Sequence, residues 1–174
     1  MNRRLFIPII LGTAREGRRS ENVAKFVLSE AKKYGFKTEL IDVKDYTTSS
    51  TQTMKKFIKD KLSSTIKKSN GLIIVSPEYN HGYPGELKMF LDNFYEEYFY
   101  KPLAICGVSK GVLGGARMVE QLRLVSIELH MIPIREAVYF ASVTNLFDAK
   151  GIIKDNSYQE RLRIMFKELE SLAK

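Results

Sequence analysis

Short apolar runs alternate with helical apolar stripes along most of the chain, and this alternation constrains the fold most strongly. Five runs have the composition of buried strands, at 5–11, 36–43, 72–75, 103–108 and 132–140. Apolar residues at the three- and four-residue spacing of amphipathic helices occupy 23–34, 54–66, 85–94, 118–129 and 162–172. Parallel strands need crossovers, which helices supply. The chain is predicted to form an α/β fold, a parallel sheet of order 2-1-3-4-5 with helices on both faces.

The chain fits one domain, residues 1–174, that folds by its core alone. Cys106 is the single cysteine, which excludes an internal disulfide and a thiolate metal cluster. Its apolar neighbours predict a small buried hydrophobe rather than a nucleophile. No apolar run reaches the roughly 18 residues of a membrane span, and the start of the chain is more typical of a strand than of a signal peptide. We expect a cytoplasmic protein without a membrane partner.

The formal charge of +8 raises the possibility of nucleic-acid binding, because a basic surface attracts polyanions. Much of the excess lies on one predicted helix without aromatic residues between the charges, at Lys55, Lys56, Lys59, Lys61, Lys67 and Lys68. A solvated lysine face explains this pattern better than base stacking does. We therefore expect no nucleic-acid partner. The second cluster, Arg15, Arg18 and Arg19, directly follows the first strand and indicates a binding loop.

In a sheet of this order, ligands bind beyond the carboxyl ends of the strands, where the order reverses between the first and third strands. The segment 12–23 joins the first strand to the first helix there. Its unpaired backbone N–H groups, hydroxyls and guanidinium groups favour a phosphate monoester. It contains neither Gly-Lys-Ser/Thr nor Gly-x-Gly-x-x-Gly. The alternative is a basic surface loop with Ser20 or Asn22 as the helix cap.

Two further segments follow the third and fourth strands. Residues 76–85 hold two prolines and two glycines in ten positions, which suits a loop that holds peptide groups against a flat ligand. Residues 109–117 hold three glycines in five positions, and these allow close approach of backbone to a ligand. The alternatives are an ordinary strand-to-helix connection and a helix-entry turn. Because all three segments fall at the same edge of the sheet, we predict one site there.

These residues resemble the NADPH-dependent FMN reductase family of flavodoxin-like proteins, which also includes quinone, azo-dye and chromate reductases. The resemblance extends from about residue 5 to residue 134. Its most specific part is Pro77-Glu78-Tyr79-Asn80, with Pro84-Gly85 and Leu87-Lys88 downstream. It implies FMN and NADPH as cofactors, a flavodoxin-like three-layer sandwich and a small-molecule electron acceptor.

The resemblance also implies the binding residues. The family's phosphate loop corresponds here to Thr13, Arg15, Ser20 and Asn22, and extra residues at 16–19 make Arg18 an additional candidate phosphate ligand. The segment 77–80 would pass under the isoalloxazine ring, and 109–111 would approach the ring from the other side. The candidate cofactor-binding residues are therefore Thr13, Arg15, Arg18, Ser20, Asn22, Val23, Pro77, Glu78, Tyr79, Asn80, Ser109, Lys110 and Gly111.

The implied reaction passes hydride from NADPH to flavin N5 and then electrons to an acceptor such as free flavin, a quinone, an azo compound or a metal oxyanion. This scheme requires no protein acid or base. Glu78, His81 and Tyr83 are near enough to tune it, but we assign no catalytic residue and no metal ligand. His130 is expected at a helix C-terminus. A non-enzymatic flavodoxin-type carrier and a flavin-free nucleotide or anion-binding module are the alternative functions.

Six aromatic residues fall within 90–100, more than one helix face needs to cover a sheet. Aromatic enrichment of this kind is typical of interface cores. We therefore expect a homodimer or homotetramer formed partly through this segment. Packing into the core is the alternative.

Overall fold

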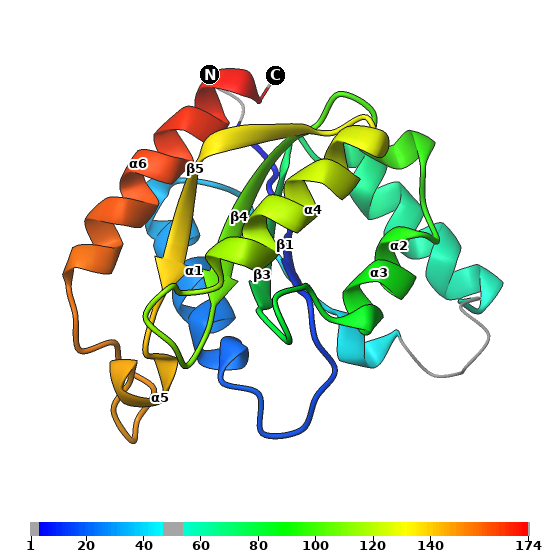
Figure 1. Cartoon of the computed structure of the whole chain (residues 1–174). Helices are drawn as coiled ribbons and strands as arrows, with labels where there is room; N and C mark the ends of the chain where they lie inside the picture. The colour runs from blue at the N-terminus through cyan, green and yellow to red at the C-terminus, as the bar shows by residue number, and fades with distance from the viewer. Residues whose placement is uncertain (1–3, 47–53, 174) are drawn as a thin grey trace.

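The computed structural model describes residues 4–46 and 54–173, and its centre is a five-stranded parallel sheet (Figure 1). The strands are β1 (Ile9–Leu11), β2 (Leu40–Asp42), β3 (Leu72–Pro77), β4 (Pro102–Val108) and β5 (Ile132–Phe140). Their order is β2-β1-β3-β4-β5, with every neighbouring pair parallel. The predicted topology is confirmed, because β3 crosses to the far side of β1 from β2.

Helices cover both faces of the sheet (Figure 1). They are α1 (Ser20–Tyr34), α2 (Lys56–Lys68), α3 (Gly85–Leu91), α4 (Ala116–Glu128), α5 (Val143–Leu146) and α6 (Ser157–Leu172), with 3₁₀ turns η1 (Val43–Asp45) and η2 (Glu96–Tyr98). Alternate strand residues point to opposite faces. Ile9 and Ile73 thus join a core with α1 and α6, whereas Ile10 and Ile74 join a second core with α2, α3 and α4. The sheet is buried on both faces, as its continuous apolar runs predict.

Several boundaries differ from the prediction. The predicted strands at 5–11 and 36–43 each shorten to three residues, and Phe6 pairs with Lys37 only as an isolated bridge. Pro8 lies between this bridge and β1, and it has no N–H to donate to a ladder. The predicted helix at 85–94 ends at Leu91, and α5 was not predicted at all. The Thr/Ser cluster at 47–51, through which the chain is expected to enter the predicted helix at 54–66, lies outside the described residues.

The expectation for Cys106 is confirmed. Its side chain is buried with Sγ 3.9 Å from Met165 Sδ, and burial raises the pKa of the thiol. A thiol held in the neutral form is a poor nucleophile. The six lysines of α2 and its approach are exposed, as predicted. Among the helices of the described segments, none has the length and apolarity to cross a bilayer.

The aromatic segment divides between the core and the surface. Phe90, Phe94 and Tyr98 are buried beneath α3 and η2. Tyr95 and Tyr100 remain 48% and 74% exposed and belong to an outer cluster with Phe99 and His130. His130 lies two residues beyond α4 with φ = 56°, and its ring centroid is 4.7 Å from that of Phe99. Core packing therefore accounts for half of the aromatic residues in this segment.

Candidate functional site

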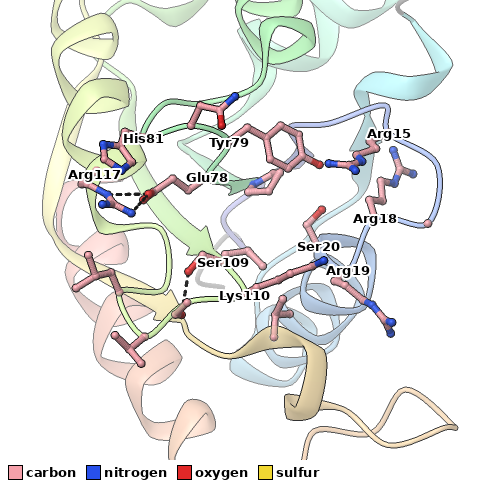
Figure 2. A pocket seen from close by; sticks show the side chains of 18 of the residues that line it. Arg15, Arg18, Arg19, Ser20, Glu78, Tyr79, His81, Ser109, Lys110 and Arg117 are labelled. Atoms are coloured by element: carbon pink, nitrogen blue, oxygen red, sulfur yellow. Dashed lines mark hydrogen bonds and ion pairs between the residues drawn. The ribbon is translucent and has the colours of Figure 1, made fainter.

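A cavity of about 830 Å³ opens at the carboxyl edge of the sheet, between the loops that follow β1, β3 and β4 (Figure 2). This volume lies toward the upper end of the range for small-molecule sites. The structure places most of the predicted residues on its lining: Arg15, Arg18, Ser20, Pro77, Glu78, Tyr79, Asn80, Ser109, Lys110 and Gly111. Thr13, Asn22 and Val23 do not line it, and Val23 is fully buried in the core under α1. The three predicted loops therefore form one cavity.

The first wall of the cavity is the beginning of α1. Ser20 is only 2% exposed and lines the cavity, and its Oγ has no hydrogen-bond partner among the residues that the structure describes. Arg19, the residue before the helix, provides no side-chain cap. The first N–H groups of a helix and its dipole favour an anion, and a buried hydroxyl without a partner is costly. This end of the cavity is built to receive hydrogen-bond acceptors.

Thr13 and Arg15 lie beside this helix start. Thr13 is fully buried, and its Oγ1 accepts a hydrogen bond from the Arg15 N–H at 3.3 Å and lies 3.4 Å from the Tyr79 hydroxyl. The Arg15 guanidinium is 5.5 Å from the centroid of the Tyr79 ring, a cation–π arrangement on an exposed side chain. Thr13 therefore joins the first loop to the second, while Arg15 remains accessible.

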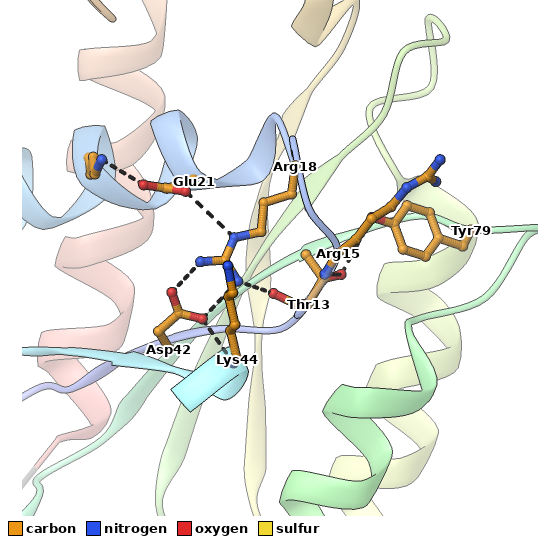
Figure 3. A network of polar contacts seen from close by, with 8 residues as sticks. Thr13, Arg15, Arg18, Glu21, Asp42, Lys44 and Tyr79 are labelled. Atoms are coloured by element: carbon orange, nitrogen blue, oxygen red, sulfur yellow. Dashed lines mark hydrogen bonds and ion pairs between the residues drawn. The ribbon is translucent and has the colours of Figure 1, made fainter. Parts of the chain in front are cut away.

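Arg18 differs from Arg15 because the protein itself occupies its guanidinium group (Figure 3). Nη1 donates to Asp42 Oδ1 at 2.8 Å and also to the carbonyl oxygen of Thr13, and Nη2 pairs with Asp42 Oδ2. The Arg18 side chain is 6% exposed, and its Nε lies 3.7 Å from Glu21. A phosphate contact by Arg18, the predicted role, would have to compete with Asp42.

Sequence reasoning missed Asp42. It ends β2, and it also accepts a hydrogen bond from the Lys44 N–H at 3.0 Å. An acidic residue at the carboxyl end of the strand beside β1 was the signal that could have found it. Nearby, Lys25 donates to Glu21 and holds the pKa of that carboxyl below its ordinary value.

The second wall is the turn after β3. Tyr79 and Gly82 exchange backbone hydrogen bonds of 2.9 and 3.0 Å. The two residues between them, Asn80 and His81, both have positive φ angles of 49° and 69°. Tight turns with two left-handed residues favour Asn at the first position. Asn80 thus sets the shape of the loop, and the Glu78 N–H holds the loop to β4 by donating to the Val108 carbonyl at 2.8 Å.

Glu78 is a buried carboxylate in this turn. Its side chain is 5% exposed, and its Oε1 accepts from Arg117 Nε at 2.7 Å and Nη2 at 2.5 Å. The Met118 N–H lies 3.5 Å from Oε2, so Glu78 reaches the start of α4. Arg117 is 47% exposed and lies beside His81 in Figure 2. Glu78 and Arg117 both line the cavity, and their ion pair fixes the turn after β3 to α4.

The third wall is the loop before α4, which hydrogen bonds hold against β5. The N–H groups of Ser142 and Val143 each donate at 3.1 Å, to the carbonyls of Gly111 and Ser109. The Ser109 N–H donates to Phe140, and its Oγ donates to the Gly111 carbonyl at 3.0 Å. The N–H groups of Lys110 and Gly111 have no partner among the described residues. The carbonyls of Ser109 and Gly111 are therefore paired, whereas the N–H groups of Lys110 and Gly111 are available as donors.

The prediction that the glycines of this third loop allow close approach to a ligand was wrong for two of them. Only Gly111 has open space around it. A Cβ on Gly114 would lie 2.7 Å from the Tyr139 carbonyl carbon, and one on Gly115 would lie 2.8 Å from the Val108 nitrogen. Both have positive φ, 59° and 91°. Gly114 and Gly115 thus allow the chain to approach its own sheet rather than a ligand.

Several lining residues were not predicted as binding residues: Glu16, Gly17, Arg19, His81, Val108, Val112, Leu113, Arg117 and Val143. Val112 and Leu113 are 85% and 50% exposed, so they offer apolar surface at the rim. Apart from Val108, which ends β4, and Val143, which begins α5, these residues lie within the three predicted segments, and that position was the available signal. No group of three potential metal-ligating side chains occurs within 4–46 and 54–173.

Comparisons with known proteins identify both the family and the fold of this chain. The NADPH-dependent FMN reductase family model matches residues 7–145. An NAD(P)H-dependent FMN reductase from a Nectria species is 35% identical over 113 residues, 60% of this chain and 55% of that protein. One from Pseudomonas aeruginosa is 29% identical, over 64% of this chain and 63% of that protein. The chain thus spans somewhat over half the length of these two relatives.

A relative of similar length exists in Staphylococcus aureus, where an FMN-dependent NADPH-azoreductase is 25% identical over 94% of this chain and 92% of that protein. Among solved structures, the flavoenzyme NAD(P)H:acceptor oxidoreductase FerB from Paracoccus denitrificans has a TM-score of 0.80 at 19% identity, covering 98% of this chain and 100% of that one. A flavodoxin from Streptococcus pneumoniae has a TM-score of 0.60 at 14% identity, covering 95% and 98%. These structures share the fold, which confirms the flavodoxin-like prediction.

The matched region contains all five strands and all three loops of the cavity. The predicted resemblance is thereby confirmed: the chain belongs to the NADPH-dependent FMN reductase family.

Proposed function

We propose that this protein is an FMN-dependent NAD(P)H oxidoreductase that transfers hydride from NADPH to bound FMN and then reduces a small acceptor. The observation that carries the proposal is the buried Ser20 hydroxyl without a partner, which lines the cavity at the start of α1. A phosphate monoester supplies the missing acceptor and the negative charge that a helix N-terminus favours. Membership of the FMN reductase family supports the same ligand.

The residues present fit FMN. Arg15 and Ser20 would hold the phosphate, with Thr13, Asn22 and Val23 shaping the loop around it. The backbone of 77–80 and the free N–H groups of Lys110 and Gly111 would position the ring, which supplies the hydride-accepting chemistry when bound. Val112 and Leu113 offer the apolar surface that a flat ring requires at the rim.

No side chain is proposed as a general acid or base. The Glu78 carboxylate is taken by Arg117, and its role is to hold the turn. Hydride transfer needs position and water exclusion rather than a protein proton donor. We propose NADPH as the reductant. For the acceptor, the azoreductase name of the Staphylococcus aureus relative makes an azo compound worth testing beside a quinone and free flavin.

Spectroscopy tests this function directly. FMN is added to the purified protein, unbound flavin is removed, and NADPH is added without oxygen. Bleaching of the flavin absorbance supports the oxidoreductase. Bound flavin that NADPH does not bleach supports a flavodoxin-type electron carrier instead. Absence of flavin binding contradicts both and leaves a nucleotide or anion-binding module.

A matched variant connects the activity to the cavity. Ser20→Ala removes the hydroxyl that carries the proposal and leaves the helix intact, because Ala is the best helix former. We expect weaker FMN binding, and an unfolding temperature of the flavin-free variant that is no lower than the parent's, because the removed hydroxyl is buried without a partner among the described residues. Ser171→Ala, on the exposed end of α6, is the control. Equal FMN affinity in Ser20→Ala and the parent would contradict the phosphate site.

We also propose a cytoplasmic homodimer or homotetramer. Tyr95 and Tyr100 keep a large exposed aromatic surface, and α4 exposes Leu124 and Ile127 to 71% and 59%. Exposed apolar side chains of this size are typical of interfaces. Light scattering at micromolar concentration is the measurement, and a monomer mass would rule out the assembly.

A further inference from the structure

Lys110 is a cation on the cavity that the protein does not use for its own structure. It is exposed and lines the cavity, and its ammonium group has no ion pair or hydrogen bond within the described parts of the chain. Figure 2 shows its side chain extending from the β4–α4 loop toward Ser20 at the start of α1. The amine of Lys110 and the hydroxyl of Ser20 thus approach the same end of the cavity from opposite loops.

The backbone around Lys110 is fixed. The carbonyls of its neighbours Ser109 and Gly111 accept hydrogen bonds from Val143 and Ser142 at 3.1 Å each, and Gly111 also accepts from Ser109 Oγ. Only the side chain of Lys110 is therefore left to adjust. A flexible lysine on a fixed base serves as a point charge for a phosphate.

The opposite loop supplies fewer cations than its sequence indicates. Arg18 is drawn inward by Asp42 and the Thr13 carbonyl, with 6% of its side chain exposed. Arg15 lies over the Tyr79 ring, and Arg19 has no partner among the described residues. A phosphate monoester carries about −1.5 to −2 charges at pH 7, and helix dipoles contribute only part of the balance. A cation that faces Ser20 from the opposite loop would add to the positive charge that Arg15 provides.

We propose that Lys110 is a ligand of the FMN phosphate, in place of Arg18. Its ammonium group donates to the phosphate that Ser20 and the α1 N-terminus hold, so the bound phosphate joins the β1–α1 loop to the β4–α4 loop. This role differs from contact with the flavin ring, which the resemblance to the FMN reductase family implies for residues 109–111. The inference rests on the proposed binding of FMN.

The test compares FMN with riboflavin, which has the same ring and no phosphate. Dissociation constants are measured by flavin fluorescence quenching for the parent, Lys110→Met and Lys110→Arg, at several salt concentrations. Lys32→Met, at the far end of α1, is the control for loss of one positive charge. We expect Lys110→Met to weaken FMN binding about tenfold and to reduce its salt dependence. Riboflavin binding should not change, and Lys110→Arg should retain most of the FMN affinity.

Each other outcome has a definite meaning. If Lys110→Met weakens FMN and riboflavin equally, Lys110 contacts the ring and the inference is wrong. If it weakens neither, or no more than Lys32→Met does, Lys110 is not a ligand. Either result leaves the proposed function standing, because the parent still binds FMN. A parent that binds neither flavin overturns the proposed function and this inference together.

Discussion

The β1–α1 loop and the β4–α4 loop flank the same cavity with similar residues, yet they are built in different ways. Both contain glycines and basic side chains. In the first, Gly17 has φ = 64° and no atom within 4 Å of a Cβ. In the second, Gly114 and Gly115 would place a Cβ within 3 Å of the protein's own backbone. The first loop projects from the sheet, and the second is pressed onto it.

The difference shows that glycine serves two separate needs at this edge. Gly17 provides a left-handed conformation only, whereas Gly115 provides that conformation and also the room for close packing. The basic residues divide in a similar way, because Arg18 holds its own loop while the Lys110 ammonium group has no partner within 4–46 and 54–173. This division predicts which loop tolerates a substitution without loss of stability. It also predicts which substitutions affect ligand binding.

The largest effect is expected for Gly115→Ala. A non-glycine residue in the left-handed region costs about 1 to 2 kcal/mol, and the clash with the backbone of Val108 adds to it. We expect a loss of about 3 kcal/mol or more in the free energy of unfolding, measured by urea denaturation. Gly17→Ala meets no clash and should lose only about 1 to 2 kcal/mol. Equal losses would show that the two loops are packed alike.

The next effect concerns the ligand rather than stability. Arg15→Ala should weaken FMN binding by about 1.5 to 3 kcal/mol, because a charge-assisted phosphate contact is lost. Flavin fluorescence quenching measures it, with Arg135→Ala on β5 as the control. A variant that keeps its flavin as tightly as the parent would contradict the assignment of this loop to the phosphate.

Substitutions of Arg18 and Asp42 should have a smaller effect. They test whether Arg18 stabilises the loop or binds the ligand. Arg18→Met and Asp42→Asn should each lower the free energy of unfolding by about 1 to 2 kcal/mol, since each leaves a partly buried partner without its ion pair. Because the two residues act as one unit, the double variant should lose less than the sum. FMN binding should weaken in both single variants. If Asp42→Asn instead strengthens FMN binding, Arg18 is a phosphate ligand that Asp42 restrains.

The smallest effect lies outside both loops, at the other end of α1. Burial, together with the hydrogen bond that Tyr34 donates to Glu170 at 2.7 Å, raises the pKa of Tyr34 to about 12. Its ordinary pKa is 10.0, so this phenol contributes stability that is complete below about pH 10 and is lost as the pH rises through about 12.

Thermal midpoints from pH 8 to 12 measure this contribution. Tyr98 is fully buried, and burial raises its pKa well above the ordinary value. It therefore also lowers stability at alkaline pH, but it does so equally in the parent and in Tyr34→Phe. The thermal midpoint of Tyr34→Phe should therefore fall less steeply with pH than that of the parent above pH 10. Superimposable profiles of the thermal midpoint against pH would show that Tyr34 does not contribute to the pH dependence of stability.

Much of this architecture was predictable because apolar periodicity is local. The runs that became β3, β4 and β5 and the stripes of α1, α4 and α6 are visible within ten to twenty residues of chain. The need for crossovers between parallel strands then predicted a sheet with helices on both faces, and its expected order brings the three loops to one edge. The ends of β1 and β2 were less predictable. Phe6 and Lys37, which form the isolated bridge on the other side of Pro8 from β1, are distant from each other in the sequence.

The sequence by itself determined the parallel sheet, its order, the buried cysteine and the loops that line the cavity. Only the tertiary structure decided what the side chains of those loops do. Arg18 meets Asp42 across 24 residues of chain, and Glu78 meets Arg117 across 39. The closeness of Gly115 to Val108 likewise follows from how α4 enters against the sheet. Periodicity records which face of an element is buried, whereas the partner of a charge or the space beside a glycine is set by contacts through space.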